Sequence, residues 1–286
     1  MTVLLKCKYK YIINMNSSSD EFKRLILSSK EPLLFRNVLK SQLLSYNLED
    51  WKNILKDREL QFRCGEFKQT NQPQWERTCK MTKGTFAYFL DQAGSESNWL
   101  YFDYKYLGEW LTDVESLRKN ISWASLGFSD ITADDTTIWI GSKGAHTPCH
   151  VDTYGFNLIF QVFGKKLWII SPPEENLKPT RIPYEESSIY SKLNFFSPST
   201  EEFKGLNNFR KIILSPGDVL FLPHKWWHYV ENLETAISIN AWMPSPEDDD
   251  ERLKESIVQM LVKQITETSG DETRKHILNP NMENVR

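Results

Sequence analysis

The pattern His150-Val151-Asp152, followed much later by His228, constrains this chain more than any other feature. In an extended strand, residues i and i+2 point to the same side, so His150 and Asp152 can both reach one metal ion. His228 follows Asp152 by 76 residues and must arrive from a distant strand. Two imidazoles and one carboxylate can cap one face of an octahedral metal, a ligand set that suits Fe(II), whereas zinc more often takes a closed tetrahedral site.

The same residues also admit a structural interpretation, in which His150 is a hydrogen-bonded core histidine and Asp152 serves a turn before Gly155. The flanking sequence favours the metal site because β-rich runs bounded by turn signals surround it. We place His228 between two strands, from which antiparallel pairing can return it to the first pair. The predicted strands are 136–142, 156–162, 165–171, 218–223 and 235–242.

Many short strands that close on a metal site predict a mainly β protein, a double-stranded β-helix or jelly roll with flanking N-terminal and C-terminal helices. We divide the chain into an N-terminal α/β extension (1–120), the core (121–246) and a C-terminal helix with a polar tail (247–286). Segment 174–211 is too long and polar for a turn, so we predict an insertion that covers the pocket mouth. Ahead of the core we expect helices at 20–29, 48–56 and 85–92 and a strand at 31–38.

The C-terminal helix begins at the capping sequence Ser245-Pro246, followed by acidic residues that favour a helix N-terminus. Two interpretations of its apolar stripe remain open: it packs against its own core, or it forms a homodimer contact. The stripe consists of Leu253, Ile257, Met260, Leu261 and Ile265.

Composition supports one large core, since 40% of the 286 residues are hydrophobic and 13% are aromatic. The net charge of −3 gives no basic surface for nucleic acid, and the lysine-containing N-terminus lacks the apolar run of a signal peptide or membrane span. Four cysteines without CxxC pairing indicate a reduced compartment. We therefore expect a cytoplasmic or nuclear location, with no nucleic-acid or membrane partner.

Further motifs resemble the JmjC family of Fe(II)/2-oxoglutarate dioxygenases, which have a cupin-like core. Within that family, the resemblance is to the branch that includes the asparaginyl hydroxylase of the hypoxia-inducible factor and a JmjC protein associated with a small heat-shock protein. Segment 179–188 supports the second of these. The resemblance covers roughly 31–246 and rests on the joint order of AHTPCHVD (145–152), GKKLW (164–168), SPP (171–173), PGDV (216–219), WWH (226–228) and NAW (240–242).

The resemblance implies that His150, Asp152 and His228 bind the metal. It also implies that Tyr101, Thr147 and Lys166 hold the C5 carboxylate of 2-oxoglutarate. A buried dicarboxylate needs a cation and hydroxyl donors at its far end, which these residue types provide.

Lys165 remains an alternative to Lys166, because the stretch between His150 and Gly164 is one residue longer than in the asparaginyl hydroxylase. Alternation along the strand does not decide between them, since both faces are apolar. We favour Lys166 from its distance to Gly164.

Asn157 and Asn240 interrupt apolar strands. The resemblance places both amides near the iron and co-substrate, while the alternative is that they satisfy backbone groups at a bulge. His146 and His224 have the wrong spacing for metal ligands. Trp168 and Trp242 are expected to form pocket or core walls, and Cys149 is expected to point away from the metal.

The implied activity requires Fe(II), 2-oxoglutarate and O2, and hydroxylates a protein side chain with release of succinate and CO2. Three alternatives stay open: N-methyl-lysine demethylation, a non-catalytic or dual-role protein that binds a small heat-shock protein, and a metal cupin that acts without 2-oxoglutarate.

Overall fold

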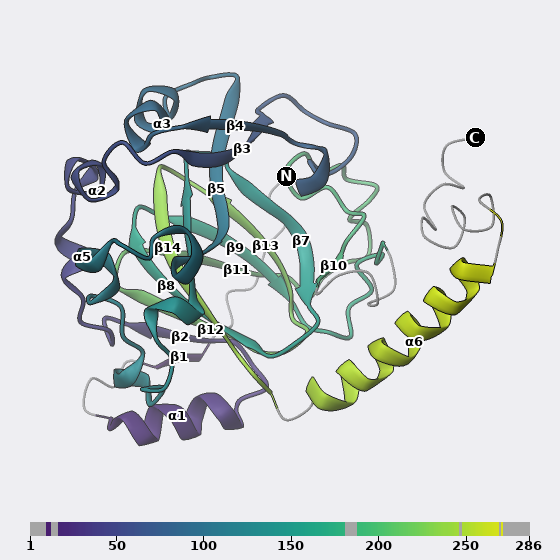
Figure 1. The fold of residues 1–286 in the computed structure, drawn as a ribbon. Helices are drawn as coiled ribbons and strands as arrows, with labels where there is room; N and C mark the ends of the chain where they lie inside the picture. Colours follow the sequence, from purple (N-terminus) through teal and green to yellow (C-terminus); the bar gives the residue numbers. More distant parts are fainter. Residues whose placement is uncertain (1–9, 13–16, 181–187, 246–247, 269, 271–286) are drawn as a thin grey trace.

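The computed structural model describes residues 10–12, 17–180, 188–245, 248–268 and 270. Two β-sheets form the body of the molecule (Figure 1). The strands of the larger sheet are β1 (Lys10–Ile12), β2 (Leu33–Arg36), β3 (Leu60–Glu66), β4 (Lys80–Gly84), β5 (Asn98–Tyr106), β6 (Thr136–Gly141), β8 (Phe156–Phe163), β12 (Asp218–Leu222) and β14 (Ala236–Met243). Those of the smaller sheet are β7 (His146–Asp152), β9 (Lys166–Ser171), β10 (Ser188–Tyr190), β11 (Arg210–Leu214) and β13 (Trp227–Asn232).

The strand order identifies a jelly roll. The larger sheet runs β1-β2-β12-β8-β14-β6-β5-β3-β4, and the smaller runs β10-β7-β13-β9-β11. Strands β6, β8, β12 and β14 of one sheet therefore face β7, β9, β11 and β13 of the other, with antiparallel pairing throughout this core. The mainly β, double-stranded β-helix prediction is confirmed.

Helices precede and follow the jelly-roll strands in the sequence. The α-helices are α1 (Ser19–Ser28), α2 (Leu48–Leu55), α3 (Phe86–Gln92), α4 (Leu107–Trp110), α5 (Glu115–Arg118) and α6 (Asp248–Thr268). Short 3-10 helices span Gln42–Ser45, Glu76–Thr78, Ala124–Leu126 and Ala133–Asp135. The three N-terminal helices that the sequence predicted are present as α1, α2 and α3, each within one residue of its predicted bounds.

The N-terminal segment shares the large sheet instead of forming one of its own. Strand β2 pairs with β12, and β5 pairs with β6, so both edges of the jelly-roll sheet are extended by earlier residues. Aromatic side chains of α3, β3 and β5, among them Phe62, Phe89 and Phe102, pack there in one buried cluster. The metal-bearing strands β7 and β13 belong to the smaller sheet, where each is likewise paired on both sides.

Two sequence predictions about the core were wrong. His228 lies within β13, not between strands, since β13 pairs with β7 on one side and β9 on the other. The β-forming neighbours Tyr229 and Val230 belong to the same central strand. The predicted insertion 174–211 also ends too late, because its last two residues begin β11, a core strand that pairs with β9.

The insertion covers the outer face of the smaller sheet. Leu177, Leu193 and Phe209 bury Cys149 and Tyr229 there. Cys149 therefore faces away from the pocket, as strand alternation predicts.

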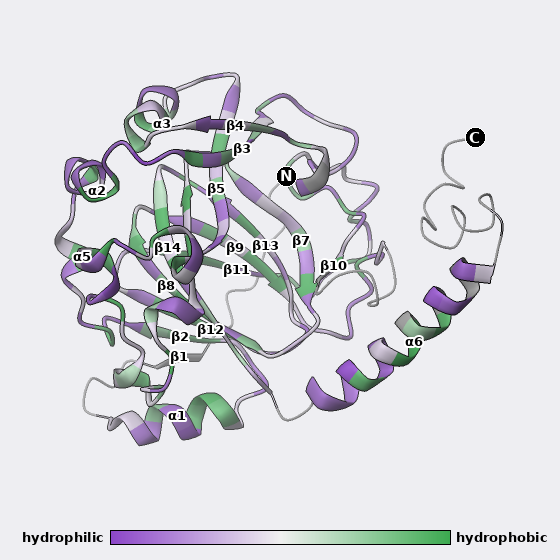
Figure 2. Ribbon diagram, in the orientation of Figure 1, coloured by the Kyte–Doolittle hydropathy of each residue, from purple (hydrophilic) through white to green (hydrophobic). Residues whose placement is uncertain are grey.

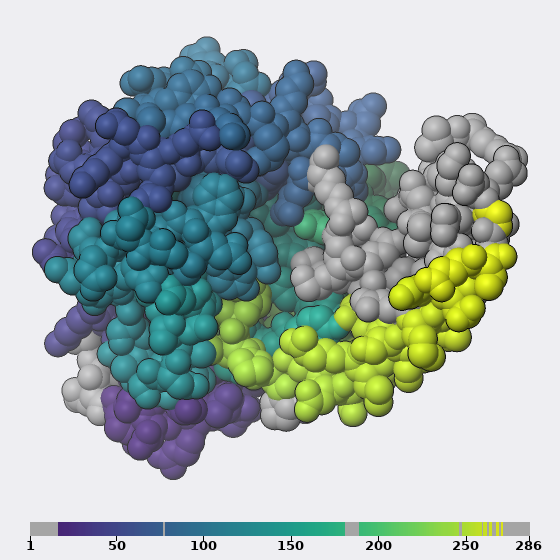
Figure 3. All heavy atoms as spheres, in the orientation of Figure 1, coloured from purple at the N-terminus to yellow at the C-terminus, as the bar shows by residue number. Residues whose placement is uncertain are grey.

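Helix α6 lies along the edge of the molecule (Figures 1 and 3). Its first turn is anchored, because Asp248 Oδ1 accepts a 2.7 Å hydrogen bond from the Gly155 amide and Arg252 lies over the Tyr154 ring. Four apolar side chains farther along remain exposed in the described protein, and Figure 2 shows hydrophobic residues on this outlying helix. They are Leu253 (61% exposed), Ile257 (47%), Met260 (64%) and Leu261 (53%). Packing of this stripe against its own core is therefore not observed.

Several predictions concern residues that the structure does not describe: the side chain of Ile265, residues 181–187 of the 179–188 motif, Cys7 and the tail beyond Gly270. Among the described helices, none has the length and apolar character needed to cross a membrane.

Candidate metal centre

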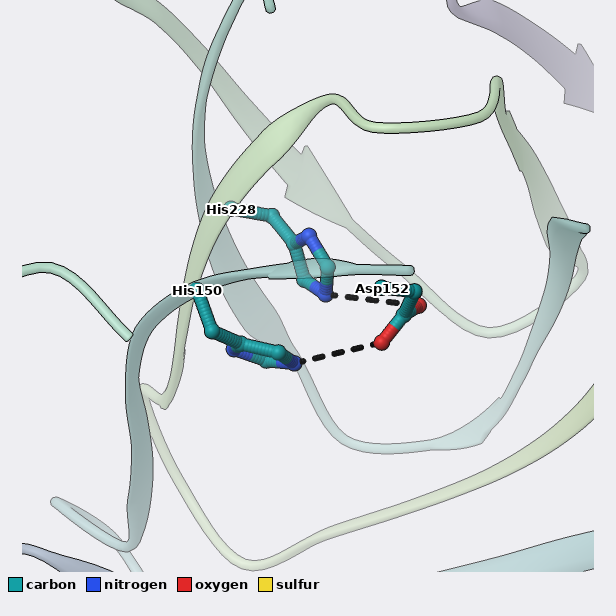
Figure 4. Close-up of side chains that lie close together, drawn as sticks. All are labelled: His150, Asp152 and His228. Carbon is teal, nitrogen blue, oxygen red and sulfur yellow. Dashed lines mark ion pairs between the residues drawn. The ribbon is translucent and has the colours of Figure 1, made fainter. Parts of the chain in front are cut away.

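Three side chains converge at the end of the smaller sheet (Figure 4). His228 of β13 lies directly opposite His150 of β7, and Asp152 follows two residues later on the same face. The Nε2 atom of His150 is 3.6 Å from Asp152 Oδ1, and that of His228 is 3.9 Å from Asp152 Oδ2. One ligating atom from each residue lies within 4.8 Å of the other two, close enough for all three to hold one ion.

Backbone carbonyls orient both imidazoles. His150 Nδ1 is 2.9 Å from the Pro148 carbonyl, and His228 Nδ1 is 2.9 Å from the Trp226 carbonyl. Because a carbonyl only accepts, each Nδ1 donates its hydrogen there, which leaves Nε2 as the ring nitrogen that faces Asp152 and that a metal could bind. Metal-binding histidines commonly have such a partner on the second ring nitrogen.

The electrostatics also suit a cation. Burial lowers the pKa of His228 to about 4, so this ring is neutral at pH 7. Burial opposes the charge of Asp152, but the hydrogen bond to His150 and the nearby histidine charges hold its pKa below the usual range. Burial is likewise outweighed at His150, whose pKa is raised by Asp152, so a bound cation would displace a proton there.

A small cavity beside the triad contains the predicted co-substrate residues Tyr101, Thr147 and Lys166. Lys166 is 1% exposed, and its Nζ donates to Ser238 Oγ at 2.8 Å and Tyr101 Oη at 3.2 Å. No carboxylate of the described residues lies within ion-pair distance of this amine. Burial lowers the pKa of Lys166 to about 7. A buried amine that is surrounded by hydroxyl groups fits a ligand that brings its own carboxylate.

The two candidate lysines have different environments. Lys166 begins β9 and points into the cavity, together with Trp168, whereas Lys165 precedes the strand and is exposed to solvent. The structure therefore brings only Lys166 to Tyr101 and Thr147.

Asn157 and Asn240 line the same cavity. The Oδ1 atom of each is buried without a hydrogen-bond partner among the described residues. Neither oxygen satisfies a backbone group at a bulge, so the structural alternative receives no support at these atoms. Two buried acceptors that face a cavity fit a donor supplied by a ligand or water.

The other two histidines near the pattern lie apart from the triad. His146 Nδ1 contacts the Gly144 carbonyl at 2.9 Å, and its ring stacks on Phe196. His224 Nε2 is 2.7 Å from the Thr153 carbonyl. Neither belongs to the group of potential metal ligands.

Sequence reasoning missed three contributions to this cavity. Ser238 binds the Lys166 amine, Trp139 forms part of the wall, and Trp242 Nε1 donates a 2.9 Å hydrogen bond to Asp152 Oδ2. Strand alternation could have identified Ser238 and Trp242, because both share one face of β14 with Asn240, which was predicted.

Comparisons with known proteins agree with this geometry. Residues 19–249 match the family model of the cupin-like domain. The chain is 37% identical over 280 residues to human HSPB1-associated protein 1, and the alignment covers 91% of this chain and 57% of that protein. It is 32% identical over 286 residues to the HSPB1-associated protein 1 homolog of Danio rerio, with 93% and 64% covered.

A shorter similarity, 32% identity over 119 residues, relates 40% of the chain to 26% of lysine-specific demethylase 8 of Xenopus tropicalis. The chain thus spans less than two thirds of each of these curated relatives. The family match over most of the chain, joined with the jelly-roll core, shows that this protein belongs to the cupin-like domain family as a JmjC-type member.

Proposed function

We propose that this protein is an Fe(II)- and 2-oxoglutarate-dependent oxygenase that hydroxylates a protein side chain. The observation that carries the proposal is the position of the buried Lys166 amine, which shares one cavity with His150 and His228 and has no carboxylate partner among the described residues. A metal cupin that acted without 2-oxoglutarate would gain nothing from burying an amine there at a desolvation cost.

His150, Asp152 and His228 would hold the iron. When bound, Fe(II) supplies the chemistry that couples O2 reduction and decarboxylation of 2-oxoglutarate, to succinate and CO2, with hydroxylation of a C–H bond. Their nitrogen and oxygen donors fit Fe(II), and three ligands on one face leave room for co-substrates.

The remaining cavity residues would bind and orient 2-oxoglutarate. Lys166 would pair with the C5 carboxylate of 2-oxoglutarate, with Tyr101 and Thr147 adding hydroxyl groups. Asn157 and Asn240 would supply amides near the metal end. Trp139, Trp168 and Trp242 line the cavity and would limit the access of water, which would strengthen each of these polar contacts.

The test is turnover by the purified protein with Fe(II), 2-oxoglutarate, O2 and a peptide substrate. We expect succinate formation and a gain of one oxygen atom on the peptide, both lost in His228→Ala. Release of formaldehyde in place of a stable oxygen adduct would support the alternative, N-methyl-lysine demethylation. A wild-type protein that binds iron but forms no succinate would contradict the proposal.

We also propose a small heat-shock protein as a partner, because two relatives that match most of this chain are named HSPB1-associated protein 1 or its homolog. Binding and hydroxylation can coexist on one chain. Titration of a small heat-shock protein with and without iron separates them, since binding that needs neither iron nor the triad would favour an adaptor role.

A second copy of the chain is the proposed occupant of the apolar stripe on α6. The stripe is exposed over about two and a half helical turns, from Leu253 to Leu261. Apolar surface of that extent is stabilised by burial in an interface. The proposed compartment remains the cytoplasm or nucleus, where Cys64, Cys79 and Cys149 would stay reduced.

A further inference from the structure

The turn that follows Asp152 is held by contacts from elsewhere in the chain. Strand β7 ends at Asp152, whose carboxylate faces both histidines of the triad (Figure 4), and β8 begins four residues later. The carbonyl of Thr153 accepts a 2.7 Å hydrogen bond from Nε2 of His224. The guanidinium carbon of Arg252 lies 4.3 Å from the centre of the Tyr154 ring. The chain just after the carboxylate ligand is therefore attached to two other segments.

The third residue of this turn lies against the end of β14. Gly155 has a φ of 61°, and a Cβ atom at this position would lie 2.2 Å from the Met243 carbonyl oxygen. That separation is shorter than any van der Waals contact, so only glycine lets the turn approach so closely. Trp242, the residue before Met243, donates its indole hydrogen to Asp152 Oδ2. The end of β14 therefore contacts both the carboxylate ligand and the turn behind it.

Asp248 joins these two segments of the chain. Its Oδ1 accepts a 2.7 Å hydrogen bond from the Gly155 amide, and its Oδ2 accepts a 2.9 Å hydrogen bond from the Ser245 amide. Asp248 is only 3% exposed. Loss of either bond would leave a carboxylate oxygen desolvated without a donor, so both bonds restrain the side chain. The first residue of α6 thus ties the turn after Asp152 to the chain that leaves β14.

The acidic residues next to Asp248 have a different environment. Asp249 and Asp250 are exposed to solvent in the same helical turn. All three carboxylates interact favourably with the positive end of the helix dipole, and an exposed side chain is sufficient for that. Burial of Asp248 against the turn therefore calls for a role beyond the stability of α6.

We propose that Asp248 is a positioning residue of the metal centre. It holds the Gly155 turn against the end of β14 and so fixes the direction in which Asp152 presents its carboxylate to the metal. Trp242 restrains that carboxylate directly, whereas Asp248 restrains the backbone behind it. A ligand whose direction is set in advance loses less conformational freedom when the metal binds. This inference rests on the proposed oxygenase function.

Binding of Mn(II), which stands in for Fe(II) at nitrogen and oxygen ligands, tests the proposal without turnover. The paramagnetic resonance signal of free Mn(II) decreases as the ion binds, so a titration gives the dissociation constant. We expect Asp248→Ala to weaken Mn(II) binding roughly tenfold, the lower end of the range for residues behind a metal ligand. Asp248→Asn should regain most of this loss, because its amide oxygen can still accept from the Gly155 amide.

Asp249→Ala is the matched control. It removes the same charge from the same helical turn, but from an exposed position, and should bind Mn(II) as the native protein does. Denaturant unfolding of the metal-free variants identifies those that are folded at the temperature of the titration. If Asp248→Ala is not folded there, Asp248→Ser takes its place with the same expected direction, because serine lacks the second oxygen.

Native Mn(II) affinity in the folded alanine or serine variant would overturn the inference, and so would an equal loss of affinity in Asp249→Ala or in Asp248→Asn. A native protein that binds no Mn(II), or an Asp152→Ala variant that binds it equally well, would instead remove the metal centre on which the proposed function depends.

Discussion

The indole nitrogen of Trp242 donates a 2.9 Å hydrogen bond to Asp152 Oδ2, across the cavity from the strand that carries the aspartate. This bond fixes one carboxylate oxygen, while the other faces His150 Nε2. Strand β14 therefore helps to orient a side chain of β7, although the two strands belong to different sheets.

Trp242→Phe should weaken Fe(II) binding by roughly 10- to 100-fold, the usual effect of removing a partner of a metal ligand. The ring volume is largely kept, so the unfolding transition should change little. Anaerobic Fe(II) titration measures the affinity. Trp110→Phe, a half-buried tryptophan beside Phe102, is the control and should bind iron as the native protein does.

Binding of 2-oxoglutarate should weaken as the pH rises above about 7. Burial sets the pKa of Lys166 to about 7 without ligand, and a bound carboxylate raises it. Below pH 7 the amine is already charged, so the affinity for 2-oxoglutarate should not depend on pH. Above pH 7 the affinity should fall by up to about tenfold for each pH unit, until the pKa of Lys166 in the complex is reached.

Calorimetry in buffers of different ionisation enthalpy checks this, since binding near pH 8 should take up a proton. Lys166→Met should lose both the affinity and the proton uptake. Lys165→Met, at the exposed neighbour, should retain both; a pH-independent affinity in the native protein would contradict the assignment.

Asp103→Ala should destabilise the fold by about 3–5 kcal/mol, because it leaves the buried Arg63 guanidinium without its counter-charge. Denaturant unfolding measures the loss. The double variant Arg63→Met/Asp103→Leu should recover part of it. The exposed pair Lys83–Glu59 provides the comparison, and Glu59→Ala should cost less than about 1 kcal/mol.

Ile257→Glu should convert a dimer to a monomer if α6 carries the self-association interface. A charge at the middle of the apolar stripe would be buried unpaired in the dimer. Light scattering after size exclusion gives the mass. A native protein that is monomeric at all concentrations would refute this contact.

Much of the jelly roll could be predicted from the sequence, because its central strands are apolar runs bounded by Gly and Pro. Strand β11 was not predicted, because Arg210–Leu214 alternates buried and exposed residues after a long polar insertion, without a distinct turn signal. His228 was placed outside a strand because Pro223 to Lys225 resembles a loop that continues to it. Local sequence does not show that β13 is paired on both sides.

The metal triad was predictable because its spacing satisfies strand alternation. The Lys165 and Lys166 alternatives could not be separated in sequence, since burial of one face depends on which sheet faces it. Ser238 was missed for a similar reason: a serine in a strand becomes a lysine partner only when β9 and β14 approach each other across the barrel. The irregularity at Tyr104, where the β5–β6 register shifts between Phe102 and Lys105 and the φ of Tyr104 is 52°, has no signal in the local sequence.

Anaerobic titration with Fe(II) and then 2-oxoglutarate, which follows the weak visible charge-transfer band of the chelate, tests the metal centre and the co-substrate pocket together. We expect the band in the native protein and not in Asp152→Ala. Iron binding without a band would contradict the co-substrate pocket around Lys166, and absence of iron binding would contradict the metal centre itself and favour the interaction protein.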